Sequence, residues 1–280
     1  MMENAEQTTK DTVLAFYREL PFNYRESARH HAKQIRSVNQ LLSYPCLAPL
    51  LRRGATLLDV GCGAGWLALT ASYHYGCDVT GIDFNEVVIK RAREVAENLG
   101  IAARFHAGDL FVFENPTRYD FVTSLGVLHH TEDCHAAIRR LCTVFVAPGG
   151  YVFIGLYHRH GRRAFLDHFR QMKVARASEA DMLKEYRRLH STISDETQLG
   201  SWFRDQVLHP HETQHTLREL MPVLRESGMT LVATSINGFG RFSDPAELYE
   251  AEERLDQVGI ERLARGHYYP GFFVVLARKA

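Results

Sequence analysis

The sequence has no surplus of positive charge. Its 280 residues include 33 lysines and arginines and 33 aspartates and glutamates, so the formal net charge is zero. A protein that binds duplex nucleic acid usually carries additional basic residues, which neutralise the phosphates. The charge balance therefore argues against nucleic acid as a partner, although it leaves local basic patches open.

Paired cysteines and long hydrophobic runs are also missing. The five cysteines are scattered and none forms a C-x-x-C pair, which argues against a disulfide framework and against a thiolate zinc site. The longest apolar runs, Tyr151–Tyr157 and Phe272–Ala277, fall far short of the roughly 20 residues that span a bilayer. The first residues lack the basic start and apolar core of a signal peptide. We therefore expect a cytoplasmic protein with no membrane partner.

The composition is that of an ordinary globular chain. Hydrophobic residues make up 45% and charged residues 24%, with 9 prolines and 20 glycines, which excludes disordered and collagen-like classes. From Thr56 onward, short β-branched or aliphatic runs alternate with amphipathic helical stretches. This alternation predicts an α/β fold with a doubly wound, mostly parallel sheet. The predicted strands are Thr56–Val60, Asp78–Ile82, Ala103–His106, Phe121–Ser124, Tyr151–Tyr157, Thr230–Ile236 and Gly271–Arg278.

The same pattern divides the chain into four parts. Residues 1–54 are expected to form an N-terminal helical extension, and residues 55–157 a Rossmann-like core. Residues 158–228 are rich in histidine, arginine, glutamate and glutamine, and they predict a helical cap inserted into the core. Residues 229–280 contain the final strands, which complete the sheet, with an acidic helix at Pro245–Gln257 between them.

The strongest local signal is a glycine-rich loop after the first strand. Residues 59–66 read DVGCGAGW, so a buried strand runs through three alternating glycines into a helix. Glycine permits positive φ angles and lets a ligand approach the backbone. The loop N–H groups and the helix N-terminus favour an anionic group. The G-x-G-x-G spacing is one residue tighter than the G-x-G-x-x-G of dinucleotide-binding folds.

Two acidic residues follow the next two strands. Asp83 ends the second strand, where its carboxylate can accept hydrogen bonds from both hydroxyls of a ribose. Phe84 comes next and can lie against a flat base. Asp109 follows the third strand and suits an exocyclic amine. Each acid alone is typical of a turn or cap, but together they lie at successive carboxyl ends of one sheet, where open α/β folds bind ligands.

These motifs, in this order, resemble the class I S-adenosylmethionine-dependent methyltransferases. The stretches that carry the resemblance are DVGCGAG, GID, GDL, YDFVTSLGVLHH and APGGYVFIGLY. They cover residues 55–157 densely and the final strands loosely. The resemblance implies a Rossmann-like, seven-stranded sheet whose last strand is antiparallel, and S-adenosylmethionine as the cofactor.

The resemblance also implies a role for each part of the cofactor site. The three glycines line the methionyl end, Asp83 holds the ribose, and Asp109 with Leu110 meets adenine. Asp59 orients the loop and the amino group, and the carbonyl near Leu125 helps to hold the ammonium. The full set of expected cofactor-binding residues is Asp59, Gly61, Cys62, Gly63, Gly65, Trp66, Asp83, Phe84, Asp109, Leu110 and Leu125.

The substrate side is less sharply marked than the cofactor side. His130 follows the fourth strand and is a candidate base, since histidine titrates near neutral pH. Tyr157 and His158 end the fifth strand at the same rim, and Tyr24 belongs to the N-terminal extension; these four are the predicted catalytic residues. Further substrate-side candidates are Tyr17, His129, Trp202 and Phe203. A capping or packing role is the alternative for each histidine.

Two polar segments of the cap have competing interpretations. The basic run at residues 158–163 could clamp an acidic group of a substrate, or it could be a solvated helix start. Residues 211–215 read HETQH and match the zinc protease pattern H-E-x-x-H. They follow Pro210, which predicts a helix with both histidines on one face. No third histidine follows at the expected spacing, so we predict no metal site.

The leading functional interpretation is a methyltransferase that acts on a small molecule by in-line methyl transfer. The fourth-strand residues Ser124 to Val127 depart from the Asn-Pro-Pro-Tyr pattern linked to nitrogen methylation of DNA and glutamine. One alternative is a lyase or cyclase that cleaves or cyclises the aminocarboxypropyl arm of S-adenosylmethionine. Another is a non-catalytic module that binds the cofactor. The acceptor atom and the oligomeric state stay open at this point.

Overall fold

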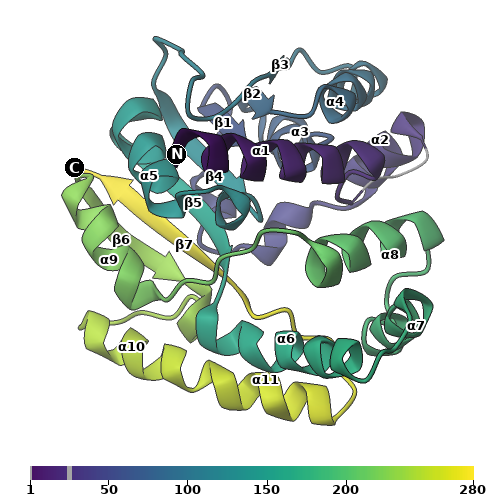
Figure 1. Cartoon of the computed structure of the whole chain (residues 1–280). Helices are drawn as coiled ribbons and strands as arrows, with labels where there is room; N and C mark the ends of the chain where they lie inside the picture. The colour runs from purple at the N-terminus through teal and green to yellow at the C-terminus, as the bar shows by residue number, and fades with distance from the viewer. Residues whose placement is uncertain (1, 24–26) are drawn as a thin grey trace.

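The computed structural model describes residues 2–23 and 27–280, and a seven-stranded sheet forms its centre (Figure 1). The order of the strands across the sheet is β3-β2-β1-β4-β5-β7-β6. This order reverses next to β1, and ligands of open α/β sheets bind at such a reversal. The strands are β1 Thr56–Val60, β2 Asp78–Asp83, β3 Arg104–Ala107, β4 Tyr119–Leu125, β5 Val146–Tyr157, β6 Met229–Thr234 and β7 Phe272–Lys279.

The direction of the strands confirms the predicted fold class. Strands β1 to β5 pair in parallel, whereas β7 lies antiparallel between β5 and β6. Successive side chains of a strand point to opposite faces of the sheet. Accordingly Leu57 and Leu58, neighbours on β1, belong to the two different hydrophobic cores that cover the sheet.

Helices cover both faces of the sheet. On the face of Leu57, the core includes residues from α2 (Ala28–Ser37), α3 (Trp66–Tyr75) and α4 (Glu86–Leu99). On the face of Leu58, α5 (Cys134–Arg140) and α9 (Leu217–Glu226) supply the core residues. Parallel strands covered in this way bury both faces, which explains the unbroken run of buried residues Val152–Tyr157 in β5.

The segment after β5 forms helices with a hydrophobic cluster of their own. These are α6 (Arg159–Val174), α7 (Glu179–Leu189) and α8 (Glu196–Phe203), followed by a π-helical turn at Arg204–Leu208. Their buried cluster includes Phe165, Tyr186 and Phe203. The assignment of residues 158–228 to a separate cap stays a prediction.

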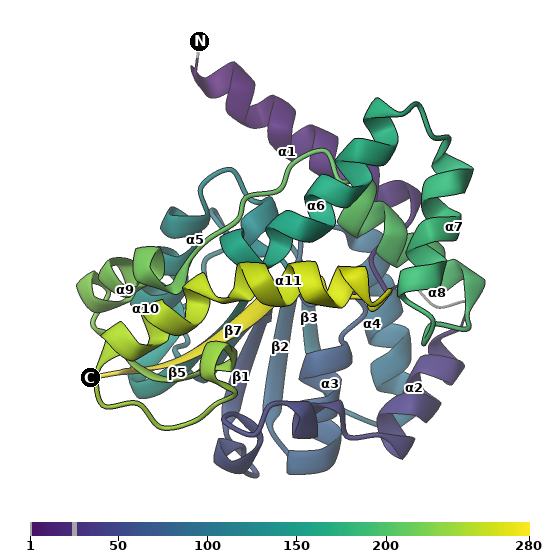
Figure 2. The same cartoon turned by 90° about the horizontal axis from the view of Figure 1, so that it is seen from below.

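The acidic helix predicted at Pro245–Gln257 is wrong in its extent. The structure has two helices there, α10 (Pro245–Glu253) and α11 (Leu255–Ala264). Helix α11 lies alongside α6 (Figures 1 and 2). Gly259 permits this close approach, because a Cβ at that position would lie 3.0 Å from the carbonyl oxygen of Gly161. The sequence pattern missed α11 because Gly259 is its one fully buried residue.

The N-terminal helix α1 (Met2–Glu19) packs near the helices that follow β5. The Asn23 side-chain oxygen accepts hydrogen bonds from Gln198 and from the indole of Trp202. Arg204 forms an ion pair with Glu19 at 2.6 Å. Among residues 2–23 and 27–280, no helix is long and apolar enough to cross a membrane.

Candidate functional site

The glycine loop joins β1 to α3 and is fastened to the end of β2. The backbone N–H groups of Gly61 and Cys62 both donate to the carbonyl of Ile82, at 2.8 and 3.0 Å. The N–H of Gly63 donates to the carboxylate of Asp83 at 2.9 Å. The loop therefore has its backbone held against the strand end that carries the predicted ribose acceptor.

Gly61 and Gly63 of this loop differ in the space around them. Gly61 has φ +70°, and a Cβ there would lie 2.3 Å from the Val127 side chain, so the segment after β4 fills the space beside it. Gly63 has φ +51°, and no atom lies within 4 Å of the position of a Cβ. Gly61 is thus required by packing, whereas Gly63 leaves an open approach to its backbone.

Asp83 is held by the backbone on both sides. Its Oδ2 accepts from Gly63, and its Oδ1 accepts from the N–H of Asn85 at 2.9 Å. Asn85 in turn caps α4 through the N–H of Val87. Burial raises the pKa of Asp83 to about 6, while the two backbone donors oppose that rise. The carboxylate keeps lone pairs for further donors, because each oxygen accepts one hydrogen bond in this arrangement.

Asp59 lies deeper than Asp83 and has a different environment. Only 4% of the residue is exposed, and its Oδ1 accepts a hydrogen bond from the Thr123 hydroxyl at 2.8 Å. Burial raises the pKa of Asp59 to about 7. The bond to Thr123 connects β1 to β4 beneath the glycine loop, which is consistent with the predicted role in orienting the loop.

The other predicted cofactor residues lie at the same edge of the sheet. Phe84 is partly exposed directly after β2, and Leu110 is buried after β3. Asp109 accepts from the N–H of Phe111 at 2.9 Å, so it also shapes its own turn. Leu125 ends β4, while Cys62 is buried and Trp66 begins α3. Their assignment to a cofactor stays a prediction.

A second group of polar side chains gathers around Asp205. We call it the Asp205 cluster and define it as Tyr17, His130, Tyr157, Asp205 and His209. The hydroxyls of Tyr17 and Tyr157 both donate to the Asp205 carboxylate, at 2.5 and 3.3 Å. Nε2 of His130 lies 3.8 Å from Oδ1 of the same carboxylate. Burial raises the pKa of Asp205, while the neighbouring His209 and the hydrogen bond from the Tyr17 hydroxyl oppose that rise.

The two histidine rings of the cluster stack against each other. The ring centroids of His130 and His209 are 3.8 Å apart, with 31° between the planes. Burial lowers the pKa of His130 to about 4 and that of His209 to about 3. Both rings are therefore neutral near pH 7. The Nε2 atoms of both are buried and have no hydrogen-bond partner among the described residues.

A buried ion pair supports this cluster from the α6 side. Arg162 is fully buried, and its guanidinium contacts the Glu212 carboxylate at 2.7 and 3.1 Å. It also donates to the carbonyl of Gln206 at 2.8 Å and lies 3.7 Å from the ring centroid of Tyr157. The pair neutralises its own charge, and Asp205 is the one acidic residue of the Asp205 cluster.

Residues 209–215 form no helix, which corrects the helix predicted after Pro210. The N–H of Thr213 donates to the carbonyl of His129, and the N–H of His215 donates to the carbonyl of Tyr157. The segment is therefore held against the 3-10 turn Leu128–His130 that follows β4 and against the end of β5, and α9 begins only at Leu217. These backbone partners compete successfully with helix formation. No group of three histidines, cysteines or acids suited to a metal occurs in the part of the chain that the structure describes.

The predicted catalytic residues have different surroundings. His130 and Tyr157 come together in the Asp205 cluster. His158 does not, because its Nε2 lies 3.0 Å from Glu252 and its Nδ1 caps α6 by accepting from Gly161. Tyr24 lies outside the described residues. His129 is fully buried beside Tyr157, and burial lowers its pKa well below the usual value.

The Asp205 cluster lies next to the glycine loop. The rings of Tyr17 and Phe84 are 6.4 Å apart, and the side-chain amide of Asn85 donates to the carbonyl of Tyr17. Val127, which packs on Gly61, lies three residues before His130. The part of a bound ligand that extends beyond the glycine loop and Asp83 would therefore lie near the Asp205 cluster.

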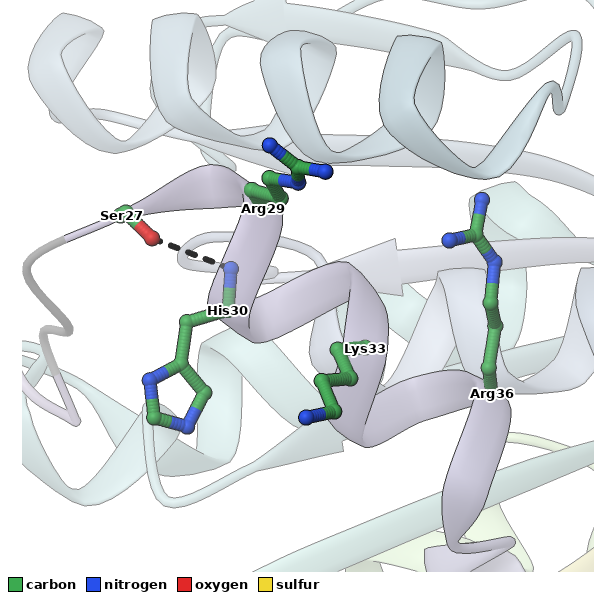
Figure 3. Close-up of a pocket in the computed structure, with 5 residues that line it drawn as sticks. All are labelled: Ser27, Arg29, His30, Lys33 and Arg36. Atoms are coloured by element: carbon green, nitrogen blue, oxygen red, sulfur yellow. Dashed lines mark hydrogen bonds between the residues drawn. The ribbon is translucent and has the colours of Figure 1, made fainter.

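The structure also has a basic groove on the outer surface of α2. A cavity of about 470 Å³ is lined by Ser27, Arg29, His30, Lys33 and Arg36 (Figure 3). None of these residues belongs to the glycine loop or to the Asp205 cluster. A second cavity, of about 530 Å³, lies between the start of α4 and Ala107 at the end of β3.

Sequence reasoning missed Asp205 and His209. Both lie in a part of the chain where the pattern predicted only helices and polar turns, and no short motif contains them. The π-helical turn that carries Asp205 is a rare conformation that is frequent at functional sites. The segment with the H-E-x-x-H pattern does belong to the surroundings of the cluster, but through the ion pair of Glu212 with Arg162.

Comparison with known proteins adds a family match. The family described as "Methyltransferase domain" matches residues 28–232. The ubiquinone biosynthesis O-methyltransferase of Bordetella avium is 36% identical over 110 residues, which are 39% of this chain and 45% of that protein. The chain thus spans about half the length of the curated relatives it matches.

Solved structures show the same fold. The putative sarcosine dimethylglycine methyltransferase from Galdieria sulphuraria aligns with a TM-score of 0.53 and 17% identity, covering 92% of this chain and 91% of that one. PKMT2 from Rickettsia typhi, solved in complex with AdoHcy, aligns with a TM-score of 0.58 and 15% identity. The alignment covers 80% of this chain and 48% of that one.

Proposed function

The chain belongs to the methyltransferase domain family, and on that premise we propose that it transfers a methyl group from S-adenosylmethionine to a small molecule. The observation that carries the proposal is the contact between the glycine loop and Asp83, whose carboxylate accepts from Gly63 at 2.9 Å. This contact brings a loop with an open backbone and a ribose acceptor to one edge of the sheet.

The residues at this edge fit the proposed cofactor. The space around Gly63 is open, so the backbone of the loop is accessible to a ligand. Asp83 has lone pairs for ribose hydroxyls, and Phe84 presents a ring beside it. Asp109 and Leu110 follow β3, where an adenine ring requires an acceptor and an apolar contact. Asp59 stabilises the strand beneath the loop through Thr123.

When bound, S-adenosylmethionine supplies an activated methyl group. The chain then has to hold the acceptor in line with that group, and correct positioning alone can lower a reaction barrier by roughly 7–11 kcal/mol. The Asp205 cluster is the part of this chain suited to that task, because it borders the glycine loop and presents polar atoms. Relatives named as O-methyltransferases and a neighbour solved with AdoHcy support the same reaction class.

Calorimetry and product analysis test the proposal. We expect S-adenosylhomocysteine to bind with one-to-one stoichiometry, and labelled S-adenosylmethionine to yield S-adenosylhomocysteine only when an acceptor is added. Prompt methylthioadenosine from S-adenosylmethionine alone would instead indicate a lyase or cyclase. Tight binding without turnover of any acceptor would indicate a binding module. Absence of binding by folded protein would refute all of these.

A further inference from the structure

The Asp205 cluster contains two buried ring nitrogens that nothing in the described chain satisfies. They are Nε2 of His130 and Nε2 of His209. A buried polar atom without a partner destabilises a fold by about 1–3 kcal/mol, so such atoms are rare and call for an explanation. Two of them on stacked rings, beside the expected cofactor site, point to a polar group of a ligand.

In each neutral ring, the hydrogen-bond partner of Nδ1 determines whether Nε2 is a donor or an acceptor. Nδ1 of His130 lies 2.9 Å from the carbonyl oxygen of His211, and a carbonyl only accepts, so Nδ1 carries the proton. The ring is neutral, and its Nε2 therefore has a free lone pair. His130 is in consequence a hydrogen-bond acceptor that lacks a donor.

His209 has the opposite arrangement. Its Nδ1 accepts from the backbone N–H of His211 at 3.1 Å, so in the neutral ring the proton is on Nε2. His209 is a donor that lacks an acceptor. The two stacked rings thus present one free acceptor and one free donor, 3.8 Å apart between centroids. A hydroxyl group can satisfy both, since its hydrogen donates and its oxygen accepts.

Burial is the main reason why the His130 ring is neutral, because it lowers the pKa of that histidine to about 4. Arg162 and His211 also oppose a positive charge there, whereas Glu212 and the hydrogen bond to the His211 carbonyl favour one. The carboxylate of Asp205 is 3.8 Å from Nε2, within reach of an ion pair if the ring becomes protonated. The titratable and charged groups that face His130 are Tyr17, His129, Tyr157, Arg162, Asp205, His209, His211 and Glu212.

We propose that the acceptor substrate presents a hydroxyl group, that His130 takes the hydroxyl proton, and that His209 hydrogen-bonds the same oxygen. This inference rests on the proposed function and assigns the acceptor chemistry of that site. The oxygen lone pair forms the new carbon–oxygen bond, and the electrons of the carbon–sulfur bond go to sulfur. The hydroxyl proton goes to Nε2 of His130, and Asp205 stabilises the imidazolium as a positioning residue.

A phenolic hydroxyl fits this site better than an aliphatic alcohol. A phenol loses its proton near pH 10, as tyrosine does, so a neutral imidazole can assist its ionisation. The surroundings are also aromatic, since the rings of Tyr17 and Tyr157 lie 6.3 and 6.2 Å from His130. An ammonium group has no lone pair, so it neither accepts from the N–H of His209 nor attacks a methyl group. A neutral amine has one, and the comparison of phenol with aniline below distinguishes it from a hydroxyl.

Nitrogen NMR of histidine-labelled protein tests the assignment without relying on turnover. The protein is saturated with S-adenosylhomocysteine and titrated with phenol, with toluene as the matched probe that lacks a hydroxyl. We expect saturable shifts at Nε2 of His130 and of His209 with phenol and none with toluene. Nδ1 of His130 should carry the proton at pH 7. His168, which pairs with Glu185 on the cap, should not shift and serves as the internal control.

Kinetics with phenol and labelled S-adenosylmethionine provide the second test. His130→Gln should reduce phenol-dependent S-adenosylhomocysteine formation at least about 100-fold, because general base catalysis contributes that much, with cofactor affinity within about threefold. Asp205→Asn should lower kcat about tenfold and leave KM for phenol within about threefold. His168→Gln should behave as wild type.

The outcomes separate this inference from the proposed function. Absence of phenol-dependent shifts, equal shifts with toluene, or normal turnover by His130→Gln would each overturn the hydroxyl assignment. Efficient methylation of aniline but not of phenol would overturn it as well, in favour of a nitrogen acceptor. In all these cases retained binding of S-adenosylhomocysteine leaves the proposed function standing, whereas loss of that binding in the wild type refutes the proposed function itself.

Discussion

The glycine loop with Asp83 and the Asp205 cluster are neighbours in the structure, but they are assembled differently. The first comes from one strand, one turn and the end of the adjacent strand. The second collects side chains from α1, β5, the segment after β4 and the π-helical turn. A local sequence motif can therefore predict the glycine loop with Asp83, whereas the Asp205 cluster forms only through packing between distant parts of the chain.

Burial also acts on the two regions with opposite consequences for their protons. It disfavours the charged form in both places. The pKa of Asp59 rises to about 7 and that of Asp83 to about 6, so these acids keep their protons up to a higher pH than a free aspartate does. The pKa of His130 falls to about 4 and that of His209 to about 3, so these histidines lose theirs. Near pH 7 the Asp83 carboxylate is therefore mostly ionised and accepts hydrogen bonds, while the neutral His130 ring has a free lone pair.

The largest expected effect concerns the support of the Asp205 cluster. Arg162→Met should lower the free energy of unfolding by about 3–5 kcal/mol, because it leaves the Glu212 carboxylate buried and unpaired. Urea denaturation measures the change. Arg187→Met is the control, since its ion pair with Glu196 is exposed and contributes less than about 1 kcal/mol. Equal losses in both variants would contradict the difference between the buried and the exposed pair.

The next effect concerns the glycine-loop region alone. Asp83→Ala should weaken the binding of S-adenosylhomocysteine about 100-fold, since hydrogen bonds to a charged acceptor contribute roughly 1.5–3 kcal/mol each. Asp205→Asn should leave that affinity within about threefold. Calorimetry measures both. A similar loss in the two variants would show that the regions do not act separately.

A smaller effect is expected from Gly63. Gly63→Ala should destabilise the protein by roughly 1–2 kcal/mol, because its φ of +51° is unfavourable for a side chain, and should also weaken cofactor binding about tenfold. Gly100→Ala is the matched control, with φ +72° and equally open space at the end of α4. It should show the same loss of stability and unchanged binding. Unchanged binding by Gly63→Ala would place the ligand elsewhere.

The smallest effect is a dependence of binding on pH. With a pKa of about 6 in the free protein, Asp83 is protonated as the pH falls through 6, and the protonated acid is a poorer acceptor for ribose hydroxyls. The affinity for S-adenosylhomocysteine should therefore fall about fourfold between pH 7.5 and 5.5. Asp83→Asn should abolish this dependence, and a dependence that persists in the variant would assign it to another group.

The sequence pattern predicted the sheet well and the contacts of residues 158–228 poorly. The strand positions follow from short β-branched or aliphatic runs that alternate with helical stretches, and the fold class is confirmed. The helix predicted after Pro210 is wrong because the N–H groups of Thr213 and His215 donate instead to His129, after β4, and to Tyr157, at the end of β5. His158 seemed accessible at a strand end, yet its partner Glu252 comes from 94 residues further along. Partners at that separation leave no local pattern.

The amino-acid sequence by itself determined the strand–turn–helix unit with its glycines and the acid at the end of the second strand. Neighbouring residues suffice for this unit, because steric limits on φ and the alternation of strands and helices act locally. Only the tertiary structure decided that Asp205 and His209 meet His130, and that two ring nitrogens stay unsatisfied there. Such a meeting depends on how the segment before α9 crosses the sheet edge, which is settled by packing over the whole chain.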